Sequence, residues 1–222
     1  MKSDSEIQKN VMEELNWEPL LNASEIGVAV KNGVVTLSGT VNTYSKKLAA
    51  EEAAKRVLGV KAVAEDLEVL LAVHGKKTDA DIAQAVINAL KWHTSIPDEK
   101  IKVKVENGWV TLDGEVEWEF QRNSARTAVK NLAGVVGISN NIAIVPTLKI
   151  SDVKNKITSA FQRSATIDAE KITISSEGSK VILTGKVRSY VEKRDAEKAA
   201  WLAPGVNKVE NKLEIDAEVY AF

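Results

Sequence analysis

The sequence predicts an α+β protein made of three tandem modules, each a small three-stranded sheet covered by two helices, with the element order α-β-β-α-β. A strand motif containing glycine occurs three times, and its glycines (Gly39, Gly114 and Gly185) lie 75 and 71 residues apart. The patterns of apolar residues around the motif repeat at the same offsets. These repeats predict modules at residues 1–72, 76–146 and 148–218.

Each module is expected to open with an amphipathic helix. Ser3 and Glu6 have the spacing of a capping box, Thr78 and Asp81 resemble it more loosely, and Ser151 is the expected cap of the third helix. Apolar residues recur at i, i+4 and i+8, on one helix face: Ile7, Val11, Leu15; Ile82, Val86, Leu90; Val153, Ile157, Phe161. Tryptophan follows the first two helices (Trp17 and Trp92), and Arg163 stands at that position in the third.

A β-hairpin is predicted next in each module. Ile26, Val28 and Val30 alternate with other residues, as do their counterparts in the later modules, which indicates strands with one buried face. The pairs Asn32-Gly33 and Asn107-Gly108 suit the positive φ values of a tight hairpin turn. Gly178-Ser179 in the third module suits a type II′ turn, which has glycine first.

The second hairpin strand contains the motif glycine, and a glycine inside a strand indicates a bulge or a close backbone approach. An alanine-rich helix follows, as in Ala50, Ala53 and Ala54. Small side chains let a helix lie close to a sheet, so the glycine and the alanines are expected to serve one packing contact. The glycines that follow each alanine-rich helix (Gly59, Gly134 and Gly205) are expected to be its C′ residues, before the last strand.

Composition excludes several function classes. The 30 basic and 31 acidic residues are balanced, which argues against a dedicated nucleic-acid binder. The net charge runs from −3 in residues 1–74 through 0 in 75–147 to +2 in 148–222. The chain has no cysteine, so disulfides and thiol chemistry are excluded. No signal peptide is evident at the start, so we expect a cytoplasmic protein, or a periplasmic one from which a signal peptide was removed.

The three motif copies, the alanine-rich helices and the Gly-Val pairs before the last strands resemble the BON domain, the bacterial osmotically inducible and nodulation module. The resemblance covers nearly the whole chain, in three tandem copies. It implies an αββαβ fold and an association with envelope integrity, osmotic stress and phospholipid binding. The chain is similar to hyperosmotically inducible periplasmic proteins, but it lacks their signal peptide. The family's motif residues are structural, so the resemblance supplies no catalytic residue.

Candidate chemistry is sparse. Only two histidines occur, His74 and His93, and neither has a second histidine or a cysteine at ligand spacing. Neither lies in a nucleophile motif. We therefore expect no catalytic residues, no metal site and no cofactor, and two solvated histidines.

The five tryptophans and a group of basic residues are the candidate contact sites. Trp109 should project away from the core, and Trp118 lies at a loop or helix start. The tryptophans either fill cores and contacts between modules or act as anchors for a lipid interface or a protein. The basic residues form either a salt-bridged surface or a weak contact with anionic lipid: Lys186, Arg188, Lys193 and Arg194.

The expected function is that of a non-enzymatic, stress-associated protein that docks on phospholipid or on an envelope-linked partner. The alternative is a cytosolic protein–protein adaptor built from tandem modules. The sequence does not indicate an oligomeric state.

Overall fold

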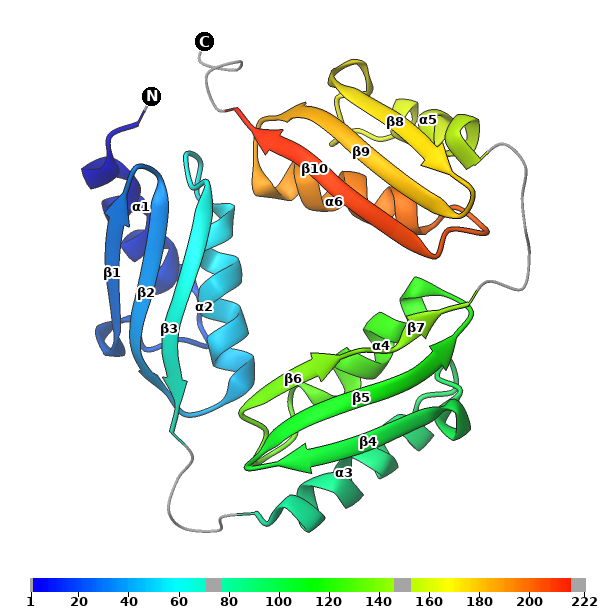
Figure 1. The fold of residues 1–222 in the computed structure, drawn as a ribbon. Coiled ribbons are helices and arrows are strands. Elements are labelled where there is room, and N and C mark those ends of the chain that lie inside the picture. Colours follow the sequence, from blue (N-terminus) through cyan, green and yellow to red (C-terminus); the bar gives the residue numbers. More distant parts are fainter. Residues whose placement is uncertain (1, 71–76, 146–152, 217–222) are drawn as a thin grey trace. The chain divides into compact units, whose positions relative to one another are not determined.

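The computed structural model describes residues 2–70, 77–145 and 153–216, which fold into three α+β modules, each with its own sheet (Figure 1). This confirms the predicted fold class. The chain order within each module is helix, short 3-10 helix, hairpin, helix and last strand.

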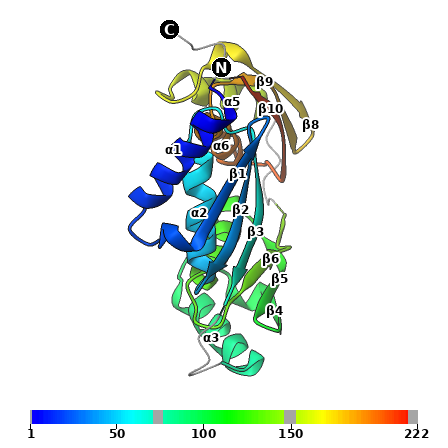
Figure 2. The same ribbon diagram turned by 90° about the vertical axis from the view of Figure 1, so that its left-hand side faces the viewer.

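In module 1, β2 is the central strand of the sheet β1-β2-β3. Figure 2 shows α1 and α2 together on one face of this sheet. The elements are α1 (Asp4–Trp17), η1 (Ala23–Glu25), β1 (Ile26–Lys31), β2 (Val34–Val41), α2 (Tyr44–Arg56) and β3 (Ala62–Val69). The predicted helix face is buried, and so are the alanines of α2, because both helices pack on the sheet.

Module 2 repeats this order but has a divided last strand. Its elements are α3 (Asp79–Trp92), η2 (Asp98–Lys100), β4 (Ile101–Glu106), β5 (Trp109–Val116), α4 (Glu119–Val129), β6 (Gly137–Asn140) and β7 (Ala143–Ile144). One continuous last strand was expected, and that expectation was wrong. The Asn140 side chain accepts a hydrogen bond from the Ile142 N–H and donates one to the Arg122 carbonyl beside this break. Asn211 makes the equivalent two bonds in module 3, where the last strand is continuous, so these bonds alone do not divide the strand.

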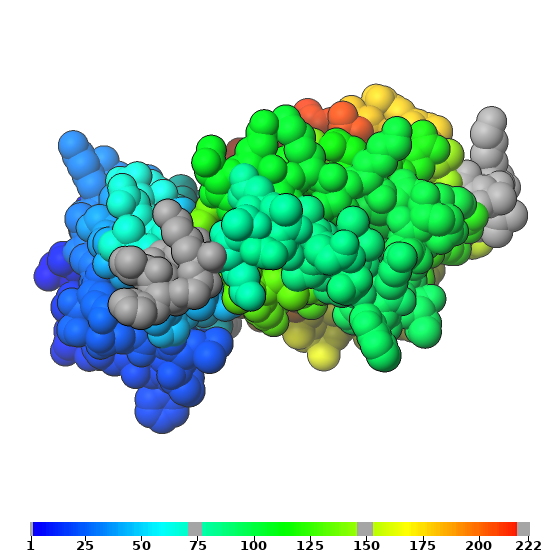
Figure 3. All heavy atoms as spheres, turned by 90° about the horizontal axis from the view of Figure 1, so that it is seen from below, coloured from blue at the N-terminus to red at the C-terminus, as the bar shows by residue number. Residues whose placement is uncertain are grey.

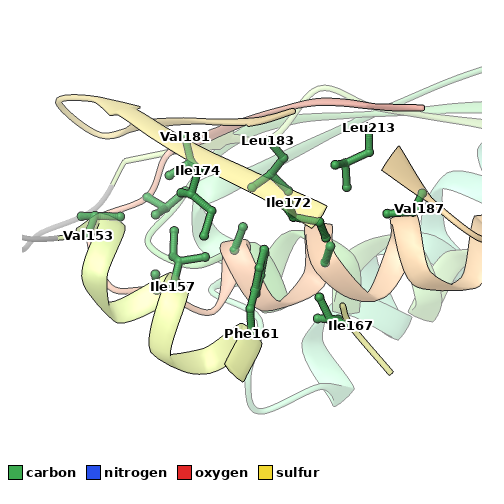
Figure 4. Packing of buried hydrophobic residues seen from close by; sticks show 14 residues of the cluster. Val153, Ile157, Phe161, Ile167, Ile172, Ile174, Val181, Leu183, Val187 and Leu213 are labelled. Atoms are coloured by element: carbon green, nitrogen blue, oxygen red, sulfur yellow. The ribbon is translucent and has the colours of Figure 1, made fainter. Parts of the chain in front are cut away.

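Module 3 contains α5 (Val153–Gln162), η3 (Ala169–Lys171), β8 (Ile172–Glu177), β9 (Lys180–Val187), α6 (Tyr190–Trp201) and β10 (Lys208–Ile215). Strand β9 pairs antiparallel with β8 and parallel with β10. Figure 4 shows Ile157 and Phe161 of α5 in the core beneath the sheet, near Val181 and Leu183 of β9. Phe161 stands where modules 1 and 2 have Leu15 and Leu90.

The first two helices begin with complete capping boxes. The Ser3 hydroxyl accepts from the Glu6 N–H, and the Glu6 carboxylate accepts from the Ser3 N–H at 2.7 Å. Thr78 and Asp81 form the same pair of bonds, so this cap is not the looser version that the sequence suggested. Ser151, the expected cap of α5, lies outside the described residues.

The hairpin turns have the predicted conformations. Asn32 and Asn107 have φ values of 54° and 50°, and the glycines after them are also positive. Gly178 has φ 60°, as the first position of a type II′ turn requires. In module 1 the Asp4 carboxylate accepts hydrogen bonds from the turn N–H groups, at 2.7 and 2.9 Å. Asp79 does the same in module 2, so the first helix holds the hairpin in both.

The motif glycines approach a backbone segment rather than the alanine-rich helix, which corrects the expected packing contact. A Cβ at Gly114 would collide with the carbonyl oxygen of Lys100, and one at Gly185 with that of Lys171. Both φ values, 139° and 128°, are also unfavourable for other residues, and Gly39 has a similar φ of 119°. The glycine therefore lets the 3-10 turn pass close to the central strand.

The second set of glycines was assigned to the wrong position. The alanine-rich helices end before these glycines are reached, and Gly59, Gly134 and Gly205 lie in the turns that follow. In module 1 the Val60 N–H donates to the Val57 carbonyl, so Gly59 is the third residue of that turn, where a type II turn requires positive φ. A Cβ at Gly59 would also lie 3.1 Å from the Ile7 side chain of α1.

Candidate interaction surfaces

Two tryptophans at equivalent positions are almost fully exposed. Trp17 ends α1 and Trp92 ends α3, and they are 83% and 87% exposed. Neither of them caps the core of its module, whereas Trp201 is partly buried against the core of module 3. Helix α3, drawn in teal-green, lies at the surface that Figure 3 shows. The exposure of these two residues could have been predicted from the helix period. Trp17 and Trp92 each come two residues after the last buried leucine of their helix, which places them on another face.

The tryptophans singled out from the sequence are less available. Trp109 lies on the outer face of β5, as predicted, and is 48% exposed. Its indole N–H donates to the Ser139 hydroxyl at 2.9 Å, and its ring lies over Gly137. Trp118 is half-buried at the N-cap of α4. The Trp109 ring is therefore held within module 2, and the Trp118 side chain is only partly accessible.

The predicted basic residues Lys186 and Arg188 have partners inside module 3. The Lys186 amine binds the Asp216 carboxylate at 2.8 Å. The Arg188 guanidinium donates to the Thr166 carbonyl and pairs with Glu192. Glu192 is buried, with 2% of its surface exposed, and it also accepts hydrogen bonds from the N–H groups of Asp168 and Arg188. These two cations therefore hold the loops around the start of α6.

Lys193 and Arg194 lie on the first turns of α6 and have different surroundings. The Lys193 amine donates to the Leu213 carbonyl at 2.6 Å. Lys47 in module 1 makes the same contact with the Leu67 carbonyl, so this lysine belongs to the repeated frame. The Arg194 side chain is 45% exposed. The four predicted cations thus do not form one open patch.

Other charges of module 3 are also paired. Lys180 and Lys212 bind the Glu210 carboxylate at 2.7 and 2.9 Å. The hydrogen bond from the Lys180 amine, and to a smaller extent the one from the Lys212 amine, lowers the pKa of Glu210 to about 2. This arrangement neutralises charge along β9 and β10.

The sequence interpretation missed the basic character of α5. This helix contains Lys154 and Lys156 and no acidic residue, and Arg163 follows it directly. Helix α1 has four acidic residues and one lysine, and α3 has two acidic residues and one lysine. The net charge of the first helix therefore rises from −3 to −1 to +2 along the chain. Counting charge by element, rather than by module, would have indicated α5.

The described part of the chain offers neither a metal-binding cluster nor a membrane-spanning helix. Within residues 2–70, 77–145 and 153–216 there is no group of three or more His, Asp or Glu side chains that could hold a metal ion. In the same ranges no helix combines the length and the apolar character needed to cross a bilayer. His93 is exposed at the end of α3, as expected, and His74 lies outside these ranges.

The chain is similar to known proteins in both sequence and structure comparisons. The chain is 29% identical over 143 residues to osmotically-inducible protein Y of Escherichia coli (strain K12), covering 63% of this chain and 71% of the relative. A structural protein of the type III secretion system of Chlamydia trachomatis, CdsD, aligns over 96% of this chain and 95% of its own, at 14% identity. Its TM-score of 0.26 is too low to indicate a shared arrangement.

The sequence profile of the BON domain matches three consecutive stretches, residues 3–70, 78–146 and 150–217. Together they cover most of the chain, and each contains one α-β-β-α-β unit of the structure. The chain therefore belongs to the BON domain family.

Proposed function

We propose that this protein is a non-enzymatic, stress-associated binding protein that docks reversibly on anionic phospholipid surfaces. Membership of the BON family and the likeness to an osmotically inducible protein support the stress association. The observation that carries the docking proposal is the exposed indole of Trp92 at the end of α3. Indole rings favour the interface between lipid and water because they are amphipathic.

Trp92 suits an anionic surface better than Trp17. Lys91 precedes Trp92, and the last turn of α3 contains no acidic residue. Trp17 has Glu13, Glu14 and Glu18 around it, which pair with the two cations Lys9 and Arg56. Three carboxylates against two cations leave a net negative charge there, which suits anionic headgroups less well. A basic residue near an anionic membrane adds roughly 1 kcal/mol of attraction, so docking through one indole and a few lysines is weak and sensitive to salt.

The test is co-sedimentation of the full chain with phosphatidylglycerol vesicles and with phosphatidylcholine vesicles, at low and high salt. We expect binding only to the anionic vesicles, and only at low salt. Trp92→Ala should weaken it about tenfold, which corresponds to a loss of about 1.4 kcal/mol. Trp17→Ala is the matched control and should change it less than about twofold.

Fluorine NMR of the chain labelled with 5-fluorotryptophan adds a local readout. The five tryptophans give separate resonances that single substitutions can assign. The Trp92 resonance should shift and broaden with anionic vesicles, while that of Trp109 stays in place. Absence of binding to phosphatidylglycerol at low salt would overturn the docking proposal.

A protein–protein adaptor is the second candidate function. The observation that favours it is a groove on module 3 between α5 and α6, which is lined by both apolar and basic side chains. Failure of lipid binding, together with binding of a peptide in this groove, would support the adaptor.

A further inference from the structure

Module 3 has an open groove between its two helices. Its volume is about 680 Å³, and residues of α5, of α6 and of the turn after α6 line it. Its apolar surface comes from Ala160, Ala199 and Leu202, and Leu202 is 73% exposed. Small alanines on facing helices leave space there for the side chains of a partner.

Module 1 closes the equivalent position with ion pairs. The Arg56 guanidinium at the end of α2 reaches across to α1 and binds Glu14 at 2.7 Å and Glu18 at 3.3 Å. In module 3 the residue equivalent to Arg56 is Leu202, and the one equivalent to Glu14 is Ala160. The replacement removes both ends of this cross-helix link, so the groove of module 3 stays open.

The groove carries positive charge along α5. Lys156 and Arg163 both line it. Lys156 is in α5 and Arg163 is the first residue after the helix, so they are about two helical turns apart along the chain. Both side chains are exposed, and neither pairs with a carboxylate among residues 153–216. Helix α5 itself has no acidic residue. A ligand of this groove should therefore be anionic at two points separated by two helical turns.

We propose that this groove binds an acidic amphipathic helix of a protein partner. The polar residues that line it, such as Asn155 and Ser159, are exposed, so it lacks the buried polar groups that orient a small molecule. A helix in the groove places apolar side chains on Ala160, Ala199 and Leu202. Carboxylates two turns apart on that helix then meet Lys156 and Arg163.

The inference is independent of membrane docking, which rests on Trp92 in module 2. The probe is a fluorescein-labelled peptide of roughly 15 residues, long enough for a marginally stable helix. It has leucines at i, i+4 and i+7 and glutamates spaced by seven residues. Fluorescence anisotropy with the full chain measures its affinity. The same peptide with glutamine in place of glutamate should bind about tenfold more weakly.

Three variants of the protein locate the binding. Lys156→Ala combined with Arg163→Ala should weaken the peptide about tenfold and remove most of the salt dependence. Lys154→Ala, on the same helix but outside the groove, is the control and should change affinity less than about twofold. Ala160→Glu combined with Leu202→Arg rebuilds the link of module 1 and should abolish binding, with an unchanged circular dichroism spectrum as the check on folding.

Equal affinity for the acidic peptide and its glutamine version would overturn the proposal. So would an unchanged affinity of the double alanine variant, or no binding of the peptide at millimolar concentration. If the double alanine variant instead loses binding to phosphatidylglycerol vesicles and keeps the peptide, the groove binds lipid and the proposal is wrong.

Discussion

Modules 1 and 3 have the same fold but opposite surfaces on their first helix. Helix α1 is acidic, and its border with α2 is bridged by Arg56. Helix α5 is basic, and its border with α6 is an open groove. The elements that support both helices are alike, down to the lysine that binds a carbonyl of the last strand. The contrast therefore comes from a few outward-facing substitutions.

The differences between modules 1 and 3 indicate which residues to associate with function. Positions that keep the same contact in both modules, such as Lys47 and Lys193, belong to the frame. Equivalent positions that have chemically different side chains in the two modules, such as Arg56 and Leu202, are the ones that distinguish the modules. In a chain built from repeats, the differences between the repeats are the best guide to what each repeat binds.

The largest effect should come from breaking the shared frame. Gly185→Ala places a Cβ against the Lys171 carbonyl at a φ of 128°, and we expect a loss of about 3 kcal/mol or more in the unfolding free energy of module 3. Gly178→Ala is the matched control. Its φ is also positive, but no atom lies within 4 Å of the added Cβ, so the cost should be about 1 kcal/mol.

Urea unfolding of the two variants checks this pair, with the resonances of module 3 followed by NMR. Similar losses in both variants would show that backbone conformation alone, and not the close approach of the 3-10 turn, requires the motif glycine.

A smaller effect should follow from removing Glu192, which is specific to module 3. Glu192→Ala leaves the N–H groups of Asp168 and Arg188 without an acceptor, and we expect a loss of about 2 kcal/mol. Glu192→Gln should lose less, because Gln121 at this position of module 2 still accepts hydrogen bonds from two backbone N–H groups. Measuring the unfolding free energies of both variants tests this difference. Equal losses of stability in the two variants would contradict the role of Glu192 as a hydrogen-bond acceptor.

The link of module 1 should contribute less to stability. Arg56→Leu copies module 3 and removes both ion pairs, and partly exposed pairs are worth about 0.5 to 1 kcal/mol. Thermal unfolding of this variant and of Glu14→Ala measures the contribution. A loss well above 1 kcal/mol would mean that Arg56 also supports the packing of α1 on α2.

The smallest effect should be a response of α1 and α3 to acid. Hydrogen bonds from the Ser3 N–H and hydroxyl lower the pKa of Glu6 below its ordinary value, and those from Thr78 lower the pKa of Asp81 in the same way. The stabilisation by each cap is therefore complete above the unfolded pKa and is lost as pH falls through the folded one. Amide exchange in the first turns of both helices should increase in that range.

Carboxyl NMR titration checks the direction of these shifts, and Glu6→Gln should remove the pH response of α1. A Glu6 carboxyl that titrates at or above its ordinary value would contradict the capping role.

Much of the fold could be predicted from local sequence. Ile7, Val11 and Leu15 show the helix period, and Asn32-Gly33 specifies its turn, because both signals depend on near neighbours. The same order of helices and strands could be assigned in all three modules, so each assignment had support from its counterparts. The surroundings of Gly114 could not be predicted, because the carbonyl that excludes a side chain there comes from another segment, at Lys100.

The candidate site was only partly predictable. The cations Lys186 and Arg188 were visible as charges, but their partners Asp216 and Glu192 are brought to them by the fold. The groove depends on alanines of two helices that are far apart in sequence. Its basic rim, however, was readable from the charge of α5.

The most direct test of the contrast between modules 1 and 3 is amide chemical-shift mapping of the full chain during titration with the acidic helical peptide. We expect shifts along α5 and at residues 199–204, with none at the equivalent residues of α1 and α2. Shifts of similar size in both modules, or shifts confined to module 1, would contradict the claim that the groove of module 3 is the specialised surface.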